Sequence, residues 1–119
     1  MKGDQKHKIK SIVYSKNNKN INIEFCDNYT SIISAELLRV ESPSAEVQGH
    51  GPKEKKTILN KNSVSITNIE KVGNYAIRII FDDGHDTGIY SWSYLRKIAE
   101  NNCELYKDYL KRVSKIIKI

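Results

Sequence analysis

The same order of residue types occurs twice in this chain of 119 residues. Residues 25–39 contain a Phe, an Asp-Asn pair, a short apolar run, a Ser and a Leu-Arg pair. Residues 81–96 repeat that order, with Asp-Gly in the turn and one extra residue, Tyr90. A strand, a tight turn, a second strand and a Ser-capped helix produce such an order. The repetition predicts two related β-hairpin-helix units packed together, and chance similarity between two such units is the competing interpretation.

The spacing of apolar residues predicts the strands. Residues 9–14 alternate apolar and polar side chains, as a half-buried strand requires, and a polar, turn-tolerant stretch joins them to residues 21–25. Gly73 and the pair Asp83-Gly84 mark two more turns, and Asp-Gly is a pair favoured in type I′ hairpins. We expect strands at residues 9–14, 21–25, 64–69, 76–81 and 87–90, with a short strand before Ser34.

Helices are expected after the strands of each unit. Ser34 and Ser91 are good N-caps, and Pro43 interrupts the first helix, with a short helical turn after it. From Glu104 onward, apolar residues follow one face of a last helix and lysines surround the rest. We expect this helix to pack on its own domain, with an anionic membrane surface as the rarer alternative. The fold class is therefore α+β: small antiparallel sheets from two related units, with a C-terminal helix packed on the domain.

Length and composition indicate one ordinary globular domain, residues 1–119. The chain is 39% hydrophobic and 29% charged. It has no apolar stretch of membrane-spanning length, and its lysine-rich first residues do not resemble a signal peptide, so we expect a soluble, cytoplasmic protein without a membrane span. Cys26 and Cys103 belong to no C-x-x-C pair, so neither a disulfide framework nor a thiolate zinc site is indicated.

The net charge of +6 raises the question of a nucleic-acid partner. Lys53 to Lys61 and the basic last helix would be the surfaces that contact phosphates. Lys, Asn and Ile are abundant along the whole chain, however, so the positive charge is not gathered into one patch. Nucleic acid is therefore an unlikely partner.

Two longer stretches resemble a known family. The first runs from Leu38 to Gly51 and contains Ser-Pro-Ser-Ala-Glu-Val-Gln-Gly-His-Gly; the second covers residues 73–95. In the second, an Asp-Gly-His turn, a strand with Tyr90 and a helix with Trp92 follow one another. Over about residues 25–98 the chain resembles the DUF971 family, also called the γ-butyrobetaine hydroxylase-like N-terminal domain, in a stand-alone bacterial-type version.

The resemblance implies a link to metal chemistry. In the carnitine-biosynthesis hydroxylases this domain precedes an iron-dependent oxygenase domain and holds zinc through three cysteines and one histidine. His85 matches that histidine, whereas residues 40–45 contain no thiol, so we expect the zinc site to be absent. Neither His85 nor His50 has the His-x-Asp or His-x-Glu spacing of an oxygenase iron site. Related domains are fused to P-loop iron-sulfur carrier proteins, which implies an accessory role near metal or cluster chemistry.

The turn at residues 82–86 carries the candidate site. It places three carboxylates and an imidazole close together, and His50 with Glu41 would complete a divalent-cation site if the side chains converge. An exposed Asp-Gly turn needs no ligand, which is the alternative. The hypothetical ligands of an unidentified metal are Glu41, His50, Asp83, His85 and Asp86. The residues assigned to a structural motif are Asp82, Asp83, Gly84, Tyr90 and Trp92; the aromatic ones are expected in the core rather than stacked on a ligand.

No residue set offers a nucleophile with a base and an oxyanion site, so we assign no catalytic residue. The sequence predicts a non-catalytic accessory or binding domain. Its partner would be another protein, one of iron-sulfur or iron-dependent chemistry, and binding could respond to metal. The first alternative is a subunit or remnant of a 2-oxoglutarate- and iron-dependent oxygenase system whose catalytic domain lies on another chain. The second is a nucleic-acid-binding module.

Overall fold

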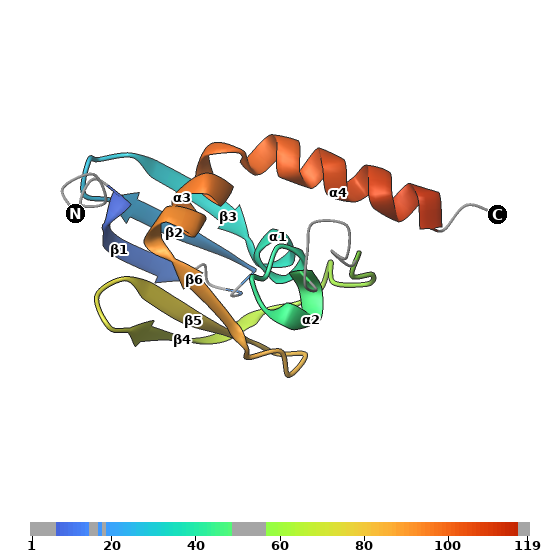
Figure 1. The fold of residues 1–119 in the computed structure, drawn as a ribbon, viewed down its shortest axis with the longest axis horizontal. Helices are drawn as coiled ribbons and strands as arrows, with labels where there is room; N and C mark the ends of the chain where they lie inside the picture. The colour runs from blue at the N-terminus through green and yellow to red at the C-terminus, as the bar shows by residue number, and fades with distance from the viewer. Residues whose placement is uncertain (1–6, 15–16, 18, 49–56, 117–119) are drawn as a thin grey trace.

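Two antiparallel sheets make up the frame of the protein (Figure 1). The structure is a computed structural model, and it describes residues 7–14, 17, 19–48 and 57–116. In both sheets the strands that follow one another in the chain are also neighbours. The first sheet contains β1 (Ile9–Tyr14), β2 (Asn20–Phe25) and β3 (Thr30–Ser34); the second contains β4 (Ile66–Val72), β5 (Ala76–Phe81) and β6 (Gly88–Ser91).

Each sheet is followed directly by a helix. Ser34 and Ser91 cap these helices, because each hydroxyl accepts a hydrogen bond from the N–H three residues later, at 3.0 and 3.1 Å. Both predicted N-caps are confirmed. The helices of the described residues are α1 (Ala35–Val40), α2 (Ala45–Gln48), α3 (Trp92–Glu100) and α4 (Asn102–Ile116).

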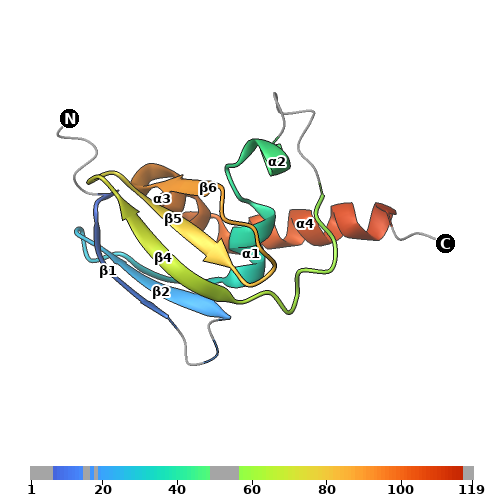
Figure 2. The same cartoon turned by 90° about the horizontal axis from the view of Figure 1, so that it is seen from below.

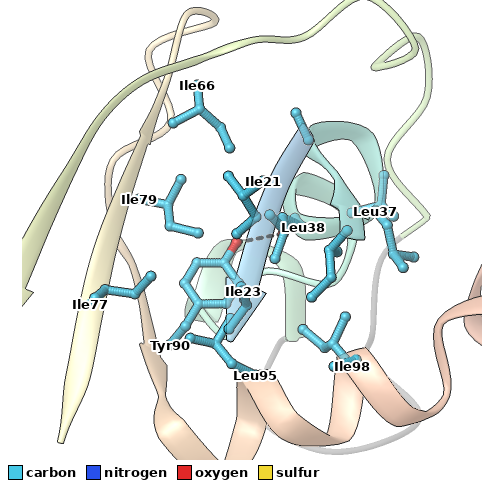
Figure 3. Packing of buried hydrophobic residues seen from close by; sticks show 14 of the residues in the cluster. Ile21, Ile23, Leu37, Leu38, Ile66, Ile77, Ile79, Tyr90, Leu95 and Ile98 are labelled. Atoms are coloured by element: carbon cyan, nitrogen blue, oxygen red, sulfur yellow. Dashed lines mark hydrogen bonds between the residues drawn. The ribbon is translucent and has the colours of Figure 1, made fainter. Parts of the chain in front are cut away.

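The hydrophobic core lies between the two sheets and the helices (Figures 2 and 3). Alternating residues of β2 and β5 point inward from opposite sides, and α1 and α3 add their apolar faces. Tyr90 is fully buried among them, and its hydroxyl donates a hydrogen bond to the carbonyl of Leu38, drawn as a dashed line in Figure 3. Core residues at the centre of this packing include Ile21, Ile23, Ile33, Leu37, Leu38, Ile77, Ile79, Tyr90, Leu95 and Ile98.

The predicted repetition is confirmed at the hairpin tips. The N–H of Phe25 donates to the carbonyl of Tyr29 at 2.9 Å, and the N–H of Phe81 donates to the carbonyl of His85 at 3.0 Å. Each of these hydrogen bonds closes a tight turn of the same length, residues 26–28 in the first hairpin and residues 82–84 in the second. The two units share turn geometry as well as residue order.

The turn type differs from the one expected at Asp83-Gly84. Gly84 has a φ of 91°, and its counterpart Asn28 has a φ of 72°, but Asp83 is not among the residues with positive φ. The N–H of Gly84 also donates to the carbonyl of Phe81 at 3.1 Å. This is a three-residue loop, a type I turn followed by one left-handed residue, and the expectation of a type I′ turn was wrong. The physical reason is that the loop contains Asp82 as a third residue.

The C-terminal helix α4 packs on the domain, as predicted. Tyr109 is buried, and Leu105, Tyr106 and Val113 contact the core cluster. Further along, the helix extends past the sheets (Figure 1), and Ile116 is exposed. Among the residues that the structure describes, no helix combines the length and the apolar character that crossing a membrane would require.

Candidate functional site

His85 follows the β5–β6 turn and is nearly buried, with 6% of its surface exposed. Its Nε2 atom lies 2.9 Å from Ser42 Oγ and 3.4 Å from Ser44 Oγ. Both serines belong to the segment between α1 and α2, and both are buried. The imidazole of the second unit thus meets two hydroxyls that follow the helix of the first unit. We call His85, Ser42 and Ser44 the Ser-His cluster.

Two tyrosines hold the segment that carries these serines. The helix α1 ends at Val40 with Glu41 as its C-cap, which leaves its last carbonyls in need of donors. The Tyr90 hydroxyl donates to the carbonyl of Leu38, and the Tyr94 hydroxyl donates to the carbonyl of Glu41 at 2.6 Å. Burial, with the nearby Glu41 carboxylate, raises the pKa of Tyr94 to about 12, so the phenol remains a donor at neutral pH. The position of Ser42 is therefore determined by both units.

Asp83 is bound by two cations and by the main chain of its own turn. Its Oδ2 lies 2.9 Å from Arg39 Nε and 2.7 Å from Lys61 Nζ. Its Oδ1 accepts the main-chain N–H of His85 at 3.0 Å. Burial alone would raise the pKa of Asp83, but the hydrogen bonds from Lys61, from the His85 N–H and from Arg39 outweigh it and lower the pKa to about 2. The carboxylate is ionised at neutral pH and fixes the turn.

Asp82 of the structural motif and the hypothetical ligands Asp86 and Glu41 each have other contacts. Asp82 accepts the N–H of Ser65 at 3.0 Å through its carboxylate. Asp86 is exposed, and its carbonyl accepts a hydrogen bond from Arg78 at 3.4 Å. Glu41 is buried, with its carboxylate 3.5 Å from the guanidinium of Arg112.

His50 lies outside the described residues. Within the described part of the chain, no three or more His, Cys, Asp or Glu side chains are grouped so that they could share a metal ion.

The residues around His85 do not fit the zinc ion that the family resemblance implies. The segment after Leu38 and Arg39 does reach the histidine, but it presents the hydroxyls of Ser42 and Ser44. Structural zinc is held by thiolates, imidazoles or carboxylates, and neutral hydroxyls are not among its usual ligands. Cys26 and Cys103 are both exposed and lie in other elements, a hairpin turn and the start of α4.

The Ser-His cluster contains the side chains of a nucleophile and a base, but a substrate cannot reach them. A serine hydroxyl hydrogen-bonded to an imidazole is the first half of a catalytic pair. Ser42 has no exposed surface, however, and so cannot meet a substrate in this conformation. The cluster instead connects the two units.

Sequence reasoning missed both serines. The signal was present in the stretch that the resemblance placed near the histidine, which was considered only for thiols.

The structural motif proposed from the sequence is divided between core and surface. Tyr90 is fully buried and Leu95 with it, as expected for core residues. Trp92 is only half-buried, and its indole N–H donates to the carbonyl of Asn74 at 2.6 Å, which ties α3 to the β4–β5 turn. Trp92 therefore reaches the surface.

The fold and the Ser-His cluster define a small α+β domain of two joined hairpin-helix units. The model of the family described as gamma-butyrobetaine hydroxylase-like, N-terminal, matches residues 12–96. The chain belongs to this family, and the resemblance seen in the sequence is confirmed, with a match that begins earlier than residue 25. No curated protein matches the sequence.

Three solved structures share this fold, and one of them is described as a DUF971-family protein. One NMR solution structure is 41% identical with a TM-score of 0.79, and the match covers 92% of this chain and 81% of the other. A second NMR structure is 38% identical with a TM-score of 0.71, covering 89% and 83%. A crystal structure of a DUF971-family protein of unknown function from Acidithiobacillus ferrooxidans ATCC 23270 is 31% identical with a TM-score of 0.67, covering 81% and 97%.

Proposed function

We propose that this chain is a non-catalytic accessory domain that binds another protein, one with iron-dependent or iron-sulfur chemistry. The observation that supports the non-catalytic part is the contact of 2.9 Å between Ser42 Oγ and His85 Nε2. Among the described residues, Ser42 and His85 have the side chains best suited to catalysis, and both are used in a buried contact between the two units. Family membership supports the iron-related partner, since the family is described by its likeness to the N-terminal part of a hydroxylase.

A metal-responsive form of this role would require the metal to replace contacts that already exist. A metal at His85 Nε2 would displace the hydroxyl of Ser42, and a metal at Asp83 would compete with Arg39 and Lys61. In each case the protein would lose a buried or charge-assisted hydrogen bond when the metal binds. Metal binding through Glu41, His50, Asp83, His85 and Asp86 stays a prediction. Titration of Fe(II), Zn(II) or Ni(II) against the His85 and His50 ring resonances tests it directly.

The accessory function is tested with the full chain, tagged and expressed in its source organism. Cross-linking before lysis, followed by purification under denaturing conditions and mass spectrometry, identifies what the chain contacts. We expect one dominant partner. When that partner is purified separately under native conditions, we expect it to contain iron. If the partner is an oxygenase domain, the result favours the oxygenase alternative. Recovery of the chain alone, at expression near its natural level, would contradict the proposal.

A matched comparison tests whether the Ser-His cluster has a chemical role. S42A removes the hydroxyl that contacts His85, and S114A removes an exposed hydroxyl on α4 as a control. A non-catalytic role predicts that partner recovery falls only as far as S42A lowers stability. Loss of partner recovery from a fully folded S42A protein would show that the cluster itself takes part in the function.

A further inference from the structure

An open groove of about 300 Å³ lies where the edges of the two sheets approach each other. β1 is the edge strand of the first sheet and β4 is the edge strand of the second, and residues of both strands line the groove. The groove is lined by Lys8, Ile9, Lys10, Ser11, Ile12, Ile69, Lys71, Asn74, Ile77 and Trp92.

The floor of the groove is the side of the hydrophobic core that reaches solvent. Ile9, Ile12, Ile69 and Trp92 are half-buried and pack against the core cluster, while Ile77 is buried below them. These five residues come from four different elements, β1, β4, β5 and α3, so the tertiary packing brings the apolar surface together. The hydrogen bond from the Trp92 indole to Asn74 fixes the ring at one end.

The rim of the groove is positively charged. All three charged residues that line it are lysines, Lys8, Lys10 and Lys71, and all three are exposed. Lys71 pairs across the sheet with Ile77, whose side chain faces the core, so Lys71 lies on the inner side of the second sheet at its open end. Lys10 also contacts Glu24 at 3.6 Å, but that exposed pair is weak.

We propose that this groove binds an extended, acidic peptide segment of the partner protein, with aliphatic or aromatic side chains on the apolar floor and carboxylates beside the lysines. The proposal rests on the accessory function above and names its surface. Charge complementarity selects an acidic occupant. The two edge strands select an extended peptide over a free fatty acid, because main-chain groups at a sheet edge pair with another main chain.

The protein carries its own reporter for this groove. Trp92 is the single tryptophan of the chain and lines the groove, so its fluorescence responds to an occupant. The probe is a short blocked peptide in which glutamate alternates with leucine, titrated at low salt into the full chain. The control probe replaces each glutamate with lysine. We expect saturable binding of the acidic peptide alone, weakened by added salt.

Charge reversal tests the rim. The double variant K8E/K71E should weaken binding of the acidic peptide by about tenfold or more, since two attractive contacts become repulsive. The variant K107E/K111E makes the same change of net charge on exposed positions of α4, outside the groove, and should bind like the original chain. The single variants K8E and K71E serve if the double variant does not fold, and each should show a smaller loss.

Four outcomes would overturn the groove as the binding surface. The first is an unchanged Trp92 fluorescence signal on addition of the acidic peptide, and the second is equal binding of the lysine peptide and the acidic peptide. The third is equal binding of the acidic peptide by K8E/K71E and the original chain. The fourth is decanoate that saturates the groove while the acidic peptide does not compete with it. In those cases the lysines serve to prevent pairing of the exposed strand edges. If the cross-linked partner is recovered equally with K8E/K71E, the groove fails and the accessory function stands. If no partner is recovered from the original chain, the accessory function fails.

Discussion

Arg39 Nε lies 2.9 Å from Asp83 Oδ2, and this ion pair joins the helix of the first unit to the hairpin turn of the second. The reverse pair is also present. Arg96, in the helix of the second unit, lies 3.0 Å from Asp27 in the hairpin turn of the first. The two units therefore hold each other by reciprocal arginine-aspartate contacts, and the repetition of the sequence extends to their interface.

The two contacts should differ in their contribution to stability. The Asp83 side chain is 19% exposed and has both Arg39 and Lys61 as partners, whereas the Asp27 side chain is 30% exposed and pairs with Arg96. We expect D83N to lower the free energy of unfolding by about 1–2 kcal/mol and D27N by less, because charge-assisted hydrogen bonds contribute more where solvent is excluded. Urea unfolding of both variants at neutral pH measures the difference. Equal losses would show that Lys61 adds nothing.

Acid should destabilise the protein through Asp83. Its pKa is about 2 in the folded protein and about 3.9 in an unfolded chain, so the folded state favours the ionised carboxylate. The resulting stability is present above about pH 4 and is lost as the pH falls toward 2. We expect about 1 kcal/mol of pH-dependent stability in this window, after allowance for solvent screening, to be absent from D83N. Unfolding curves from pH 5 to pH 2 test this, and parallel curves for both proteins would contradict it.

The two serines of the Ser-His cluster should contribute unequally to the free energy of unfolding. Ser42 Oγ is 2.9 Å from His85 Nε2, and Ser44 Oγ is 3.4 Å away. S42A should therefore cost about 1–2 kcal/mol of unfolding free energy, because it removes the nearer partner of a buried imidazole, and S44A should cost less. Urea unfolding gives both values, and the ring ¹⁵N shifts of His85 report the change at the imidazole itself. A larger effect from S44A would mean that the two hydroxyls exchange roles in solution.

Gly88 should not tolerate a side chain. A Cβ atom there would lie 2.5 Å from Ser42 Oγ and 3.0 Å from Tyr90 Cε1, inside the packed interface of the two units. We expect G88A to cost about 1–3 kcal/mol through overpacking. G84A is the matched control, because its Cβ meets no atom within 4 Å and its cost arises only from the left-handed backbone at φ 91°. Only G88A should therefore perturb the Ser42 and Tyr90 resonances.

Thiols in place of the two hydroxyls should create a metal site. S42C/S44C would place two sulfur ligands beside the His85 imidazole, the donor types that zinc and cobalt prefer. We expect the variant to bind Co(II) with the absorption of a thiolate complex and the original chain to show no such band. Addition of H85A to the double variant should weaken that binding. An unchanged spectrum after H85A would show that the imidazole does not reach the metal.

The sequence by itself determined the local structure and the family. The signals that predicted it each extend over only a few residues, where backbone sterics and turn hydrogen bonds dominate. They are the alternation in residues 9–14 and 76–81, the caps Ser34 and Ser91, and the two Phe-to-Arg segments. The same local reasoning selected the wrong turn type at Asp83-Gly84, because loop length as well as residue pair decides it.

Only the tertiary structure decided what His85 and Asp83 contact. Ser42 lies 43 positions before His85, and Arg39 lies 44 positions before Asp83, so their meeting depends on how the two units pack and not on residue spacing. Packing also gave Asp83 its two cationic partners and left Trp92 at the surface of a lysine-rimmed groove. Such contacts follow from burial of the shared core, which selects one arrangement of the units among those that the local pattern allows.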